Sequence, residues 1–371
     1  MIKLLGMVVG TLVVYLLGAR LVVAFHSSDI KADEQVVLFA TAAHYDAAQS
    51  RWQVPIHGWI FDLEEDSLWR SALATAFVHG LNIHEDVAAQ ELFRRRARMF
   101  LVDNERNKKL TIDIAGKQVG LPKSGPNGHF TTTLSVADSD AQRHQRDGWM
   151  PLALVTPAND ARSFQAQLQL VAEHGVSVIS DIDDTVKHTN VRDKKAVIEN
   201  TFVKPFAVVA GIEQAYTEWA KQGALFHYVS SSPWQLYPAL TEFFAEVGLP
   251  AGSFYLKTFR VKDESFFDLF ASPFETKVST ISGILERWPQ RRFILVGDSG
   301  EKDPEVYARI YAQFPDQIVH IYIRNVTDED GEAERCRQAF AGVPQERWTV
   351  FKDPSVLNER IDLTPGNSTL P

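Results

Sequence analysis

The fold of this chain is most constrained by a short apolar stretch that ends in aspartates, Val176-Ser-Val-Ile-Ser-Asp-Ile-Asp-Asp-Thr185. Its β-branched residues predict a buried strand. Asp181, Asp183 and Asp184 follow at the carboxyl end, and burying three carboxylates without a positive partner is costly. A metal ion is the obvious partner, and an oxygen-only ligand set favours Mg²⁺. A polar turn explains these ten residues about as well, so the metal hypothesis needs support from the rest of the chain.

The chain after Val176 alternates strand-like and helix-like segments, which is typical of a parallel sheet with crossover helices. In such an open sheet, ligands bind beyond the carboxyl ends of the strands. The predicted strands are Val176–Ser180, Leu225–Ser230, Phe254–Lys257, Phe293–Gly297 and Ile318–Arg324, and the predicted helices are Ile212–Gln222, Trp234–Val247, Lys277–Trp288 and Glu305–Phe314.

Polar side chains lie at the ends of two more of these strands. Ser230 and Ser231 offer hydroxyl and N–H groups before a helix, an arrangement that suits a phosphate and also an ordinary helix start. Asp298 ends another buried strand and Asp303 follows after a short loop, so both are candidates to complete a Mg²⁺ shell. Lys277 is predicted at a helix start, where the helix dipole disfavours a cation. We expect its ammonium group to balance these acids.

These motifs, in this order, resemble those of the haloacid dehalogenase-like phosphatases. Asp181-Ile-Asp-Asp-Thr185 is similar to their first motif, DxDxT. Ser230, Lys277 and the Asp298/Asp303 pair fit the second, third and fourth motifs.

Three longer stretches resemble one branch, the catalytic domain of the actin-patch-associated phosphatidate phosphatase family, which also has bacterial members. The resemblance covers about residues 176–350, and it departs from the family at Ser231, where we expect the family often to carry Asn. The stretches are Ser180-Asp-Ile-Asp-Asp-Thr-Val-Lys-His-Thr-Asn-Val191, Tyr228-Val-Ser-Ser-Ser-Pro-Trp-Gln-Leu236 and Val296-Gly-Asp-Ser-Gly-Glu-Lys-Asp-Pro-Glu305.

The resemblance implies a separate role for each of three residues of the first motif. Asp181 would attack phosphorus and form an aspartyl-phosphate. Asp183 would protonate the leaving oxygen and later deprotonate the hydrolytic water. Thr185 would help to hold the geometry of the loop.

The resemblance also implies which residues bind the phosphoryl group and the metal. The expected phosphoryl-binding residues are Ser230, Ser231 and Lys277. The expected Mg²⁺ ligands are Asp181, Asp183 through its backbone carbonyl, Asp298 and Asp303.

The implied substrate is phosphatidate, which would give diacylglycerol and phosphate. The short stretch between the first two motifs predicts no large lid, which leaves the site open to a membrane-bound substrate. Phe266, Phe267, Leu269 and Phe270 would either contact the bilayer or pack on the sheet. The alternatives are a phosphatase of a soluble sugar or nucleotide phosphate, and a phosphatidate-binding module without activity. The presence of both Asp181 and Asp183 argues against such a module.

The N-terminal residues bear on localisation. Residues 4–19 are uncharged and mostly apolar, Lys3 precedes them, and Arg20 lies near the end of the run. This pattern predicts a cleaved signal peptide or a membrane anchor, and a buried soluble helix is the less favoured alternative. In both leading cases the catalytic domain lies on the other side of the membrane from Lys3.

The overall expectation is an α/β protein in which a Rossmann-like domain of haloacid dehalogenase type, over 173–355, follows a β-rich accessory domain over 35–172. A sandwich is one form that this accessory domain would take. Residues 1–25 form the hydrophobic segment and 356–371 a tail. The accessory domain is predicted to contain strands at Val36–Phe39, Trp52–Phe61, Leu110–Ile114 and Phe130–Val136, and one helix at Glu85–Met99 with Val87, Leu92 and Phe93 facing inward.

Charge and cysteine content exclude several classes of function. The formal net charge of −9 gives no basic excess to bind nucleic acid. Cys336 is the single cysteine, so an intramolecular disulfide and a zinc site built on several cysteines are excluded. The basic run Arg94-Arg-Arg-Ala-Arg98 would contact anionic lipid or, as we favour, form the solvated face of a helix. The expected partners are a phosphorylated substrate and a membrane surface, with no obligate protein partner.

Overall fold

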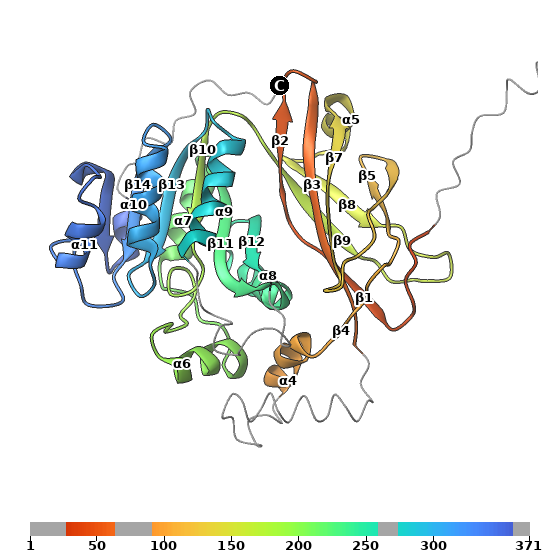
Figure 1. The fold of residues 1–371 in the computed structure, drawn as a ribbon, viewed down its shortest axis with the longest axis horizontal. Helices are drawn as coiled ribbons and strands as arrows, with labels where there is room; N and C mark the ends of the chain where they lie inside the picture. The colour runs from red at the N-terminus through yellow and green to blue at the C-terminus, as the bar shows by residue number, and fades with distance from the viewer. Residues whose placement is uncertain (1–26, 64–90, 259–273, 359–371) are drawn as a thin grey trace, which may run out of the picture.

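The computed structural model describes residues 27–63, 91–258 and 274–358, which form two sheets that lie side by side (Figure 1). One sheet has nine strands and precedes the other, which has six, along the chain. The predicted order of a β-rich region followed by an α/β region is therefore present. Residues 1–25, Val87 and the Phe266–Phe270 group lie outside the described residues, as does most of the predicted tail. No helix among the described residues is long and apolar enough to cross a membrane.

The six-stranded sheet is parallel throughout, as predicted, and its strand order is β12-β11-β10-β13-β14-β15. The central strand β10 (Val176–Ser180) is buried along its whole length, which explains its apolar sequence. The other strands are β11 (Leu225–Pro233), β12 (Gly252–Lys257), β13 (Arg292–Asp298), β14 (Ile318–Arg324) and β15 (Trp348–Phe351), of which only the short β15 was not predicted.

Helices cover both faces of this sheet (Figure 1). Val178 of β10 packs in one core cluster with α7 (Ile212–Lys221) and α8 (Tyr237–Val247), whereas Ile179 packs in another with α9 (Phe274–Arg287) and α10 (Asp303–Gln313). Successive residues of a strand point to opposite faces, so β10 joins both clusters. The short helices α6 (Lys194–Ile198) and α11 (Glu334–Ala339), and the π-helix Glu199–Val203, were not predicted.

Two helix starts differ from the sequence prediction. The helix expected to begin at Trp234 opens instead with a 3₁₀ turn over Trp234–Leu236, and the α-helix itself begins at Tyr237. Lys277 does not begin its helix: α9 includes Phe274, so the lysine lies one turn inside.

The nine-stranded sheet is hydrogen-bonded as one continuous sheet rather than as two separate sheets of a sandwich. Its main path is β1-β3-β2-β9-β8-β5-β6, and β4 and β7 pair with the long strand β3. Strands from both halves of the path contribute to a single apolar core. The strands are β1 (Glu34–Leu38), β2 (Ala42–Asp46), β3 (Arg51–Asp62), β4 (Asp103–Asn104), β5 (Thr111–Ile114), β6 (Lys117–Gly120), β7 (His129–Ala137), β8 (Trp149–Leu154) and β9 (Gln165–Val171).

Two short helices accompany this sheet. The described part of the predicted helix Glu85–Met99 is α4 (Glu91–Ala97), which continues as a 3₁₀ turn, and α5 (Asp138–His144) was not predicted. Arg96, within the basic run, is buried and donates hydrogen bonds to the carbonyls of Thr201 and Lys204. The basic run is therefore not solvated throughout. Its buried Arg96 links α4 to the end of the π-helix by hydrogen bonds.

Candidate active site

Four predicted residues come together here: Asp181 and Asp298 at the carboxyl ends of β10 and β13, Lys277 of α9, and Asp303 at the start of α10. The Lys277 Nζ atom lies 3.0 Å from Oδ1 of Asp181 and 2.5 Å from Oδ1 of Asp303. All three side chains are buried. Glu301, which was not predicted, places Oε2 3.8 Å from the same ammonium group. One buried lysine thus faces three acids.

Three of the carboxylates form a pocket of oxygen atoms that fits a cation. Ligand atoms of Asp181, Asp298 and Asp303 all lie within 4.8 Å of one another. The Oδ2 atom of Asp298 is buried and has no hydrogen-bond partner within the described residues. Burial, with the neighbouring acids, raises the pKa of both Asp181 and Asp298 well above the usual range, although Lys277 opposes this. One ammonium group does not compensate these carboxylates, so the donor set fits an added divalent cation.

The backbone at Gly297 makes this close approach possible. A Cβ atom at this position would lie only 2.2 Å from Oδ2 of Asp303. That oxygen accepts a hydrogen bond from the N–H of Asp298, and Oδ1 of Asp298 accepts one from the N–H of Gly300 at 2.6 Å. Glycine is therefore required before Asp298 for steric reasons.

The carboxylate of Asp183 lies outside the group of three and has partners of its own. It accepts hydrogen bonds from the hydroxyls of Thr189, Ser230 and Ser232 at 2.7, 2.9 and 2.7 Å, and Lys187 Nζ lies 2.8 Å away. Burial alone would raise the pKa of Asp183, but the charge and hydrogen bond of Lys187, with the hydroxyl donors, lower it to about 2. The carboxylate is therefore ionised at neutral pH, and it is not available as part of the acidic pocket.

Asp184 organises the loop that follows the first motif. Its carboxylate accepts hydrogen bonds from the backbone N–H groups of Thr189, Asn190 and Val191 at 2.8, 2.8 and 2.6 Å. Its own φ is 55°, a left-handed conformation that aspartate tolerates better than most residues. Asp184 had no expected role from sequence, and the structure gives it a structural one.

Thr185 and the serines of β11 border the acidic group. The Thr185 hydroxyl donates a hydrogen bond to Oδ2 of Asp181 at 3.3 Å. The Ser230 hydroxyl donates a hydrogen bond to Asp183 and accepts one from the N–H of Ser232. This expected phosphate-binding group is therefore already hydrogen-bonded to other residues of the protein. Ser231 is half-buried. Together with Ser230, Trp234 and Lys277 it lines a cavity of about 190 Å³.

Three site residues were missed from sequence, namely Lys187, Ser232 and Glu301. Lys187 is almost fully buried beside Asp183, and Ser232 donates to the same carboxylate. All three residues lie in the stretches that resemble the family, so their closeness to its motifs could have marked them as candidate site residues. Lys187 and Ser232 are buried, and short-range sequence pattern does not report burial.

The part of the chain that carries this site is similar in sequence to known proteins. The family model described as the phosphatidate phosphatase APP1 catalytic domain matches residues 176–325. Phosphatidate phosphatase APP1 of Saccharomyces cerevisiae is 29% identical over 289 residues, which cover 74% of this chain and 45% of that protein. An uncharacterized protein of Schizosaccharomyces pombe is 33% identical over 172 residues, which cover 45% of this chain and 28% of that protein. The chain spans less than half the length of either relative.

Solved structures add little to this result. A cobalt-bound deoxy-D-mannose-octulosonate 8-phosphate phosphatase of Haemophilus influenzae matches with a TM-score of 0.26 and 13% identity, over 45% of this chain and 75% of that chain. A D,D-heptose 1,7-bisphosphate phosphatase of Burkholderia thailandensis matches with a TM-score of 0.25 and 9% identity, over 48% and 92%. Similarity this low supports no argument about the site.

The family match begins at the first residue of β10 and ends just after β14, so it contains every residue of the acidic pocket and Lys277. The part of the chain that carries the candidate site, residues 176–325, therefore belongs to the family of phosphatidate phosphatase APP1 catalytic domains.

Proposed function

We propose that this chain is a Mg²⁺-dependent phosphomonoesterase that acts through an aspartyl-phosphate on Asp181. The observation that carries the proposal is the placement of the Asp181 carboxylate, which is buried at a strand end 3.0 Å from Lys277. It belongs to an acidic group in which one Asp298 oxygen has no hydrogen-bond partner in the described part of the chain. A nucleophile, a phosphate-binding cation and a vacant donor atom for a metal are what phosphoryl transfer to a carboxylate requires.

In the proposed first step, an Asp181 carboxylate oxygen forms a bond to phosphorus while the bond from phosphorus to the ester oxygen breaks. The ammonium group of Lys277 lies where it would stabilise the phosphoryl oxygens as well as the attacking carboxylate. A divalent cation held by Asp181, Asp298 and Asp303 would neutralise part of the substrate's negative charge, and Mg²⁺ suits this all-oxygen donor set.

In the proposed second step, Asp183 removes a proton from the water that hydrolyses the aspartyl-phosphate. The carboxylate is ionised at neutral pH, as a base must be, but a pKa of about 2 makes it a weak base while its present contacts are in place. In the first step the same group must donate a proton to the leaving oxygen. We infer that substrate binding breaks some of the contacts to Lys187 and Thr189, because those contacts oppose protonation.

We propose phosphatidate as the substrate, with diacylglycerol and phosphate as products. The name of the yeast relative supports this choice, and so does the family of the matched domain. A soluble sugar phosphate is the second candidate. It is favoured by the cavity of about 190 Å³ beside Ser230 and Lys277, which fits a glycerol-sized or sugar-sized polar group.

The decisive experiment measures phosphate release, with and without Mg²⁺, from phosphatidate vesicles and from a panel of soluble monoesters. Asp181→Asn should abolish release while the protein stays folded. Asp316→Asn, the same substitution at an exposed position on the same domain, should leave release unchanged.

Full activity in Asp181→Asn would disprove the mechanism, and a clear preference for the soluble panel would disprove the lipid assignment. Vesicle binding without phosphate release by the wild-type chain would instead identify a binding module.

We also propose that the protein acts beside a membrane, with the catalytic domain on the other side of it from Lys3 and no obligate protein partner. The apolar run at residues 4–19 supports this proposal. Membrane fractionation, together with mass spectrometry of the mature N-terminus, tests it. A soluble protein with an intact N-terminus would contradict it.

A further inference from the structure

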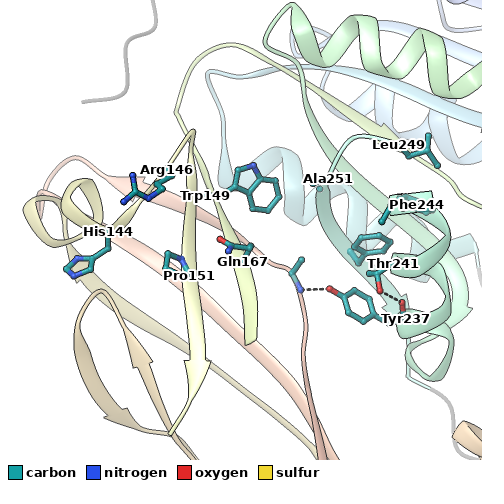
Figure 2. Close-up of a pocket in the computed structure, with 14 residues that line it drawn as sticks. His144, Arg146, Trp149, Pro151, Gln167, Tyr237, Thr241, Phe244, Leu249 and Ala251 are labelled. Carbon is teal, nitrogen blue, oxygen red and sulfur yellow. Dashed lines mark hydrogen bonds between the residues drawn. The ribbon is translucent and has the colours of Figure 1, made fainter. Parts of the chain in front are cut away.

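An apolar cleft of about 680 Å³ lies between the two sheets, away from the candidate active site (Figure 2). One wall is α8 with the loop into β12, and the other is formed by β8 and β9. The cleft reaches Gly252, at the amino end of β12, whereas the active-site cavity reaches Lys257 at the carboxyl end of the same strand. The cleft and the active-site cavity therefore lie toward opposite ends of β12.

The walls of the cleft suit a hydrocarbon chain. Trp149 and Pro151 of β8 face Phe244 and Leu249 across the gap (Figure 2). Trp149 is only half-buried and Pro151 is exposed, although both contribute apolar surface to a concave site. The volume falls in the usual range for small-molecule sites, about 300–1,000 Å³. Covering these side chains with a chain of methylene groups would remove apolar surface from water, which is favourable.

One end of the cleft carries positive charge. Arg146 and His144 lie at this end, and none of the fourteen residues that line the cleft is acidic (Figure 2). Nδ1 of His144 contacts the backbone carbonyl of Asp140. Arg146 is exposed, and its guanidinium group has no hydrogen bond or ion pair with any residue that the structure describes. A planar guanidinium group matches a carboxylate with two parallel hydrogen bonds.

The geometry points to a binding site for a long-chain carboxylate, with its acyl chain along Trp149 and Phe244 and its head group on Arg146. The site does not depend on the proposed phosphatase activity, because none of the residues that line it belongs to the acidic pocket. Tyr237 connects the cleft to the accessory sheet, since its hydroxyl accepts a hydrogen bond from the N–H of Ala40 at 2.9 Å. An occupant would therefore contact both halves of the protein.

The test is titration calorimetry of the full chain with hexadecanoate below its critical micelle concentration, with hexadecanol as the uncharged control ligand. We expect saturable binding of hexadecanoate with one site per chain. Arg146→Gln should weaken hexadecanoate binding about tenfold or more, because charge-assisted hydrogen bonds are the stronger class, and leave hexadecanol binding unchanged. Arg309→Gln removes the same charge from an exposed position on α10 and should have no effect.

Two further variants block the chain-binding part of the cleft. Thr241→Trp from α8 and Gln167→Trp from β9 each place a large ring in the gap, and either should abolish binding of both ligands. Gln167 is exposed, so its variant should fold even if Thr241→Trp does not. Asp181→Asn should bind hexadecanoate normally, which separates this site from catalysis. Absence of saturable binding, or binding that survives Gln167→Trp, would overturn the proposal.

Discussion

The ring of Phe39, from the segment after β1, lies with its centroid 4.2 Å from that of Trp234, the residue that follows the serine-rich end of β11. Phe39 is fully buried, and Trp234 also lines the cavity beside Ser230 and Lys277. His57 of the long strand β3 contacts the same indole, with centroids 4.6 Å apart. The accessory sheet thus supports one wall of the candidate active site directly.

This contact predicts that changes within the accessory sheet affect catalysis. Phe39→Leu should lower kcat/KM for phosphate release several-fold, because Trp234 loses the ring that fixes it. Phe130→Leu is the matched control, since Phe130 is equally apolar and buried but packs in the separate core of the nine-stranded sheet. Both variants should lose a similar amount of stability, of order 1–2 kcal/mol. Equal kcat/KM for the two variants would show that the contact is only structural.

The role of Asp184 predicts a loss of stability rather than of chemistry. Asp184→Asn keeps one acceptor oxygen but loses the charge that three backbone N–H groups share. Hydrogen bonds to charged groups contribute about 1.5–3 kcal/mol each, so urea unfolding should show destabilisation of about 2 kcal/mol. Phosphate release should persist at low temperature, in contrast to Asp181→Asn. Complete inactivation of a folded Asp184→Asn protein would assign Asp184 to the chemistry instead.

The acidic pocket predicts that Mg²⁺ stabilises the folded protein. A ligand present at 100 times its Kd adds about 2.7 kcal/mol to the free energy of unfolding. Thermal unfolding should therefore shift upward with Mg²⁺ and downward with EDTA. Asp298→Asn should remove most of the shift, since it alters the carboxylate whose Oδ2 has no hydrogen-bond partner among the residues that the structure describes. A Mg²⁺ shift of the same size in Asp298→Asn would place the ion elsewhere.

Buried histidines predict acid sensitivity of the fold. His227 is fully buried between the hydroxyls of Ser253 and Ser177, and burial lowers its pKa to about 3. In the unfolded chain a histidine titrates near 6.5, so between these values the unfolded state binds the proton and the folded state does not. Stability should thus fall as pH drops from about 6.5 towards 3, by about 1.4 kcal/mol per pH unit for this histidine.

The slope of stability against pH isolates this contribution. His227→Phe removes the titrating group, so its free energy of unfolding should fall less steeply from pH 6 to pH 4 than that of the wild type, whatever its absolute stability. His57 has its pKa lowered to about 3 by burial and by His129, so some slope should remain. Identical slopes in His227→Phe and the wild type would refute the assignment.

The sequence by itself determined the parallel sheet and the identity of the central acids. Five of the six strands of that sheet were predicted from apolar, β-branched runs, because strands that are buried on both faces consist mostly of apolar residues. The carboxyl ends of such strands meet at one edge, and this rule alone placed Asp181 near Asp298. The family resemblance then predicted that Ser230 and Lys277 lie beside these acids.

Only the tertiary structure decided which partner each acid has. Asp183 and Asp184 are adjacent in sequence and chemically identical, yet one carboxylate accepts from side chains and the other from backbone N–H groups. The accessory sheet reaches Trp234 through Phe39, a contact between residues 195 positions apart that no local pattern encodes. Hydrophobic periodicity reports which side of an element is buried, but the partner of a buried group depends on how distant elements pack, and that information exists only in the folded chain.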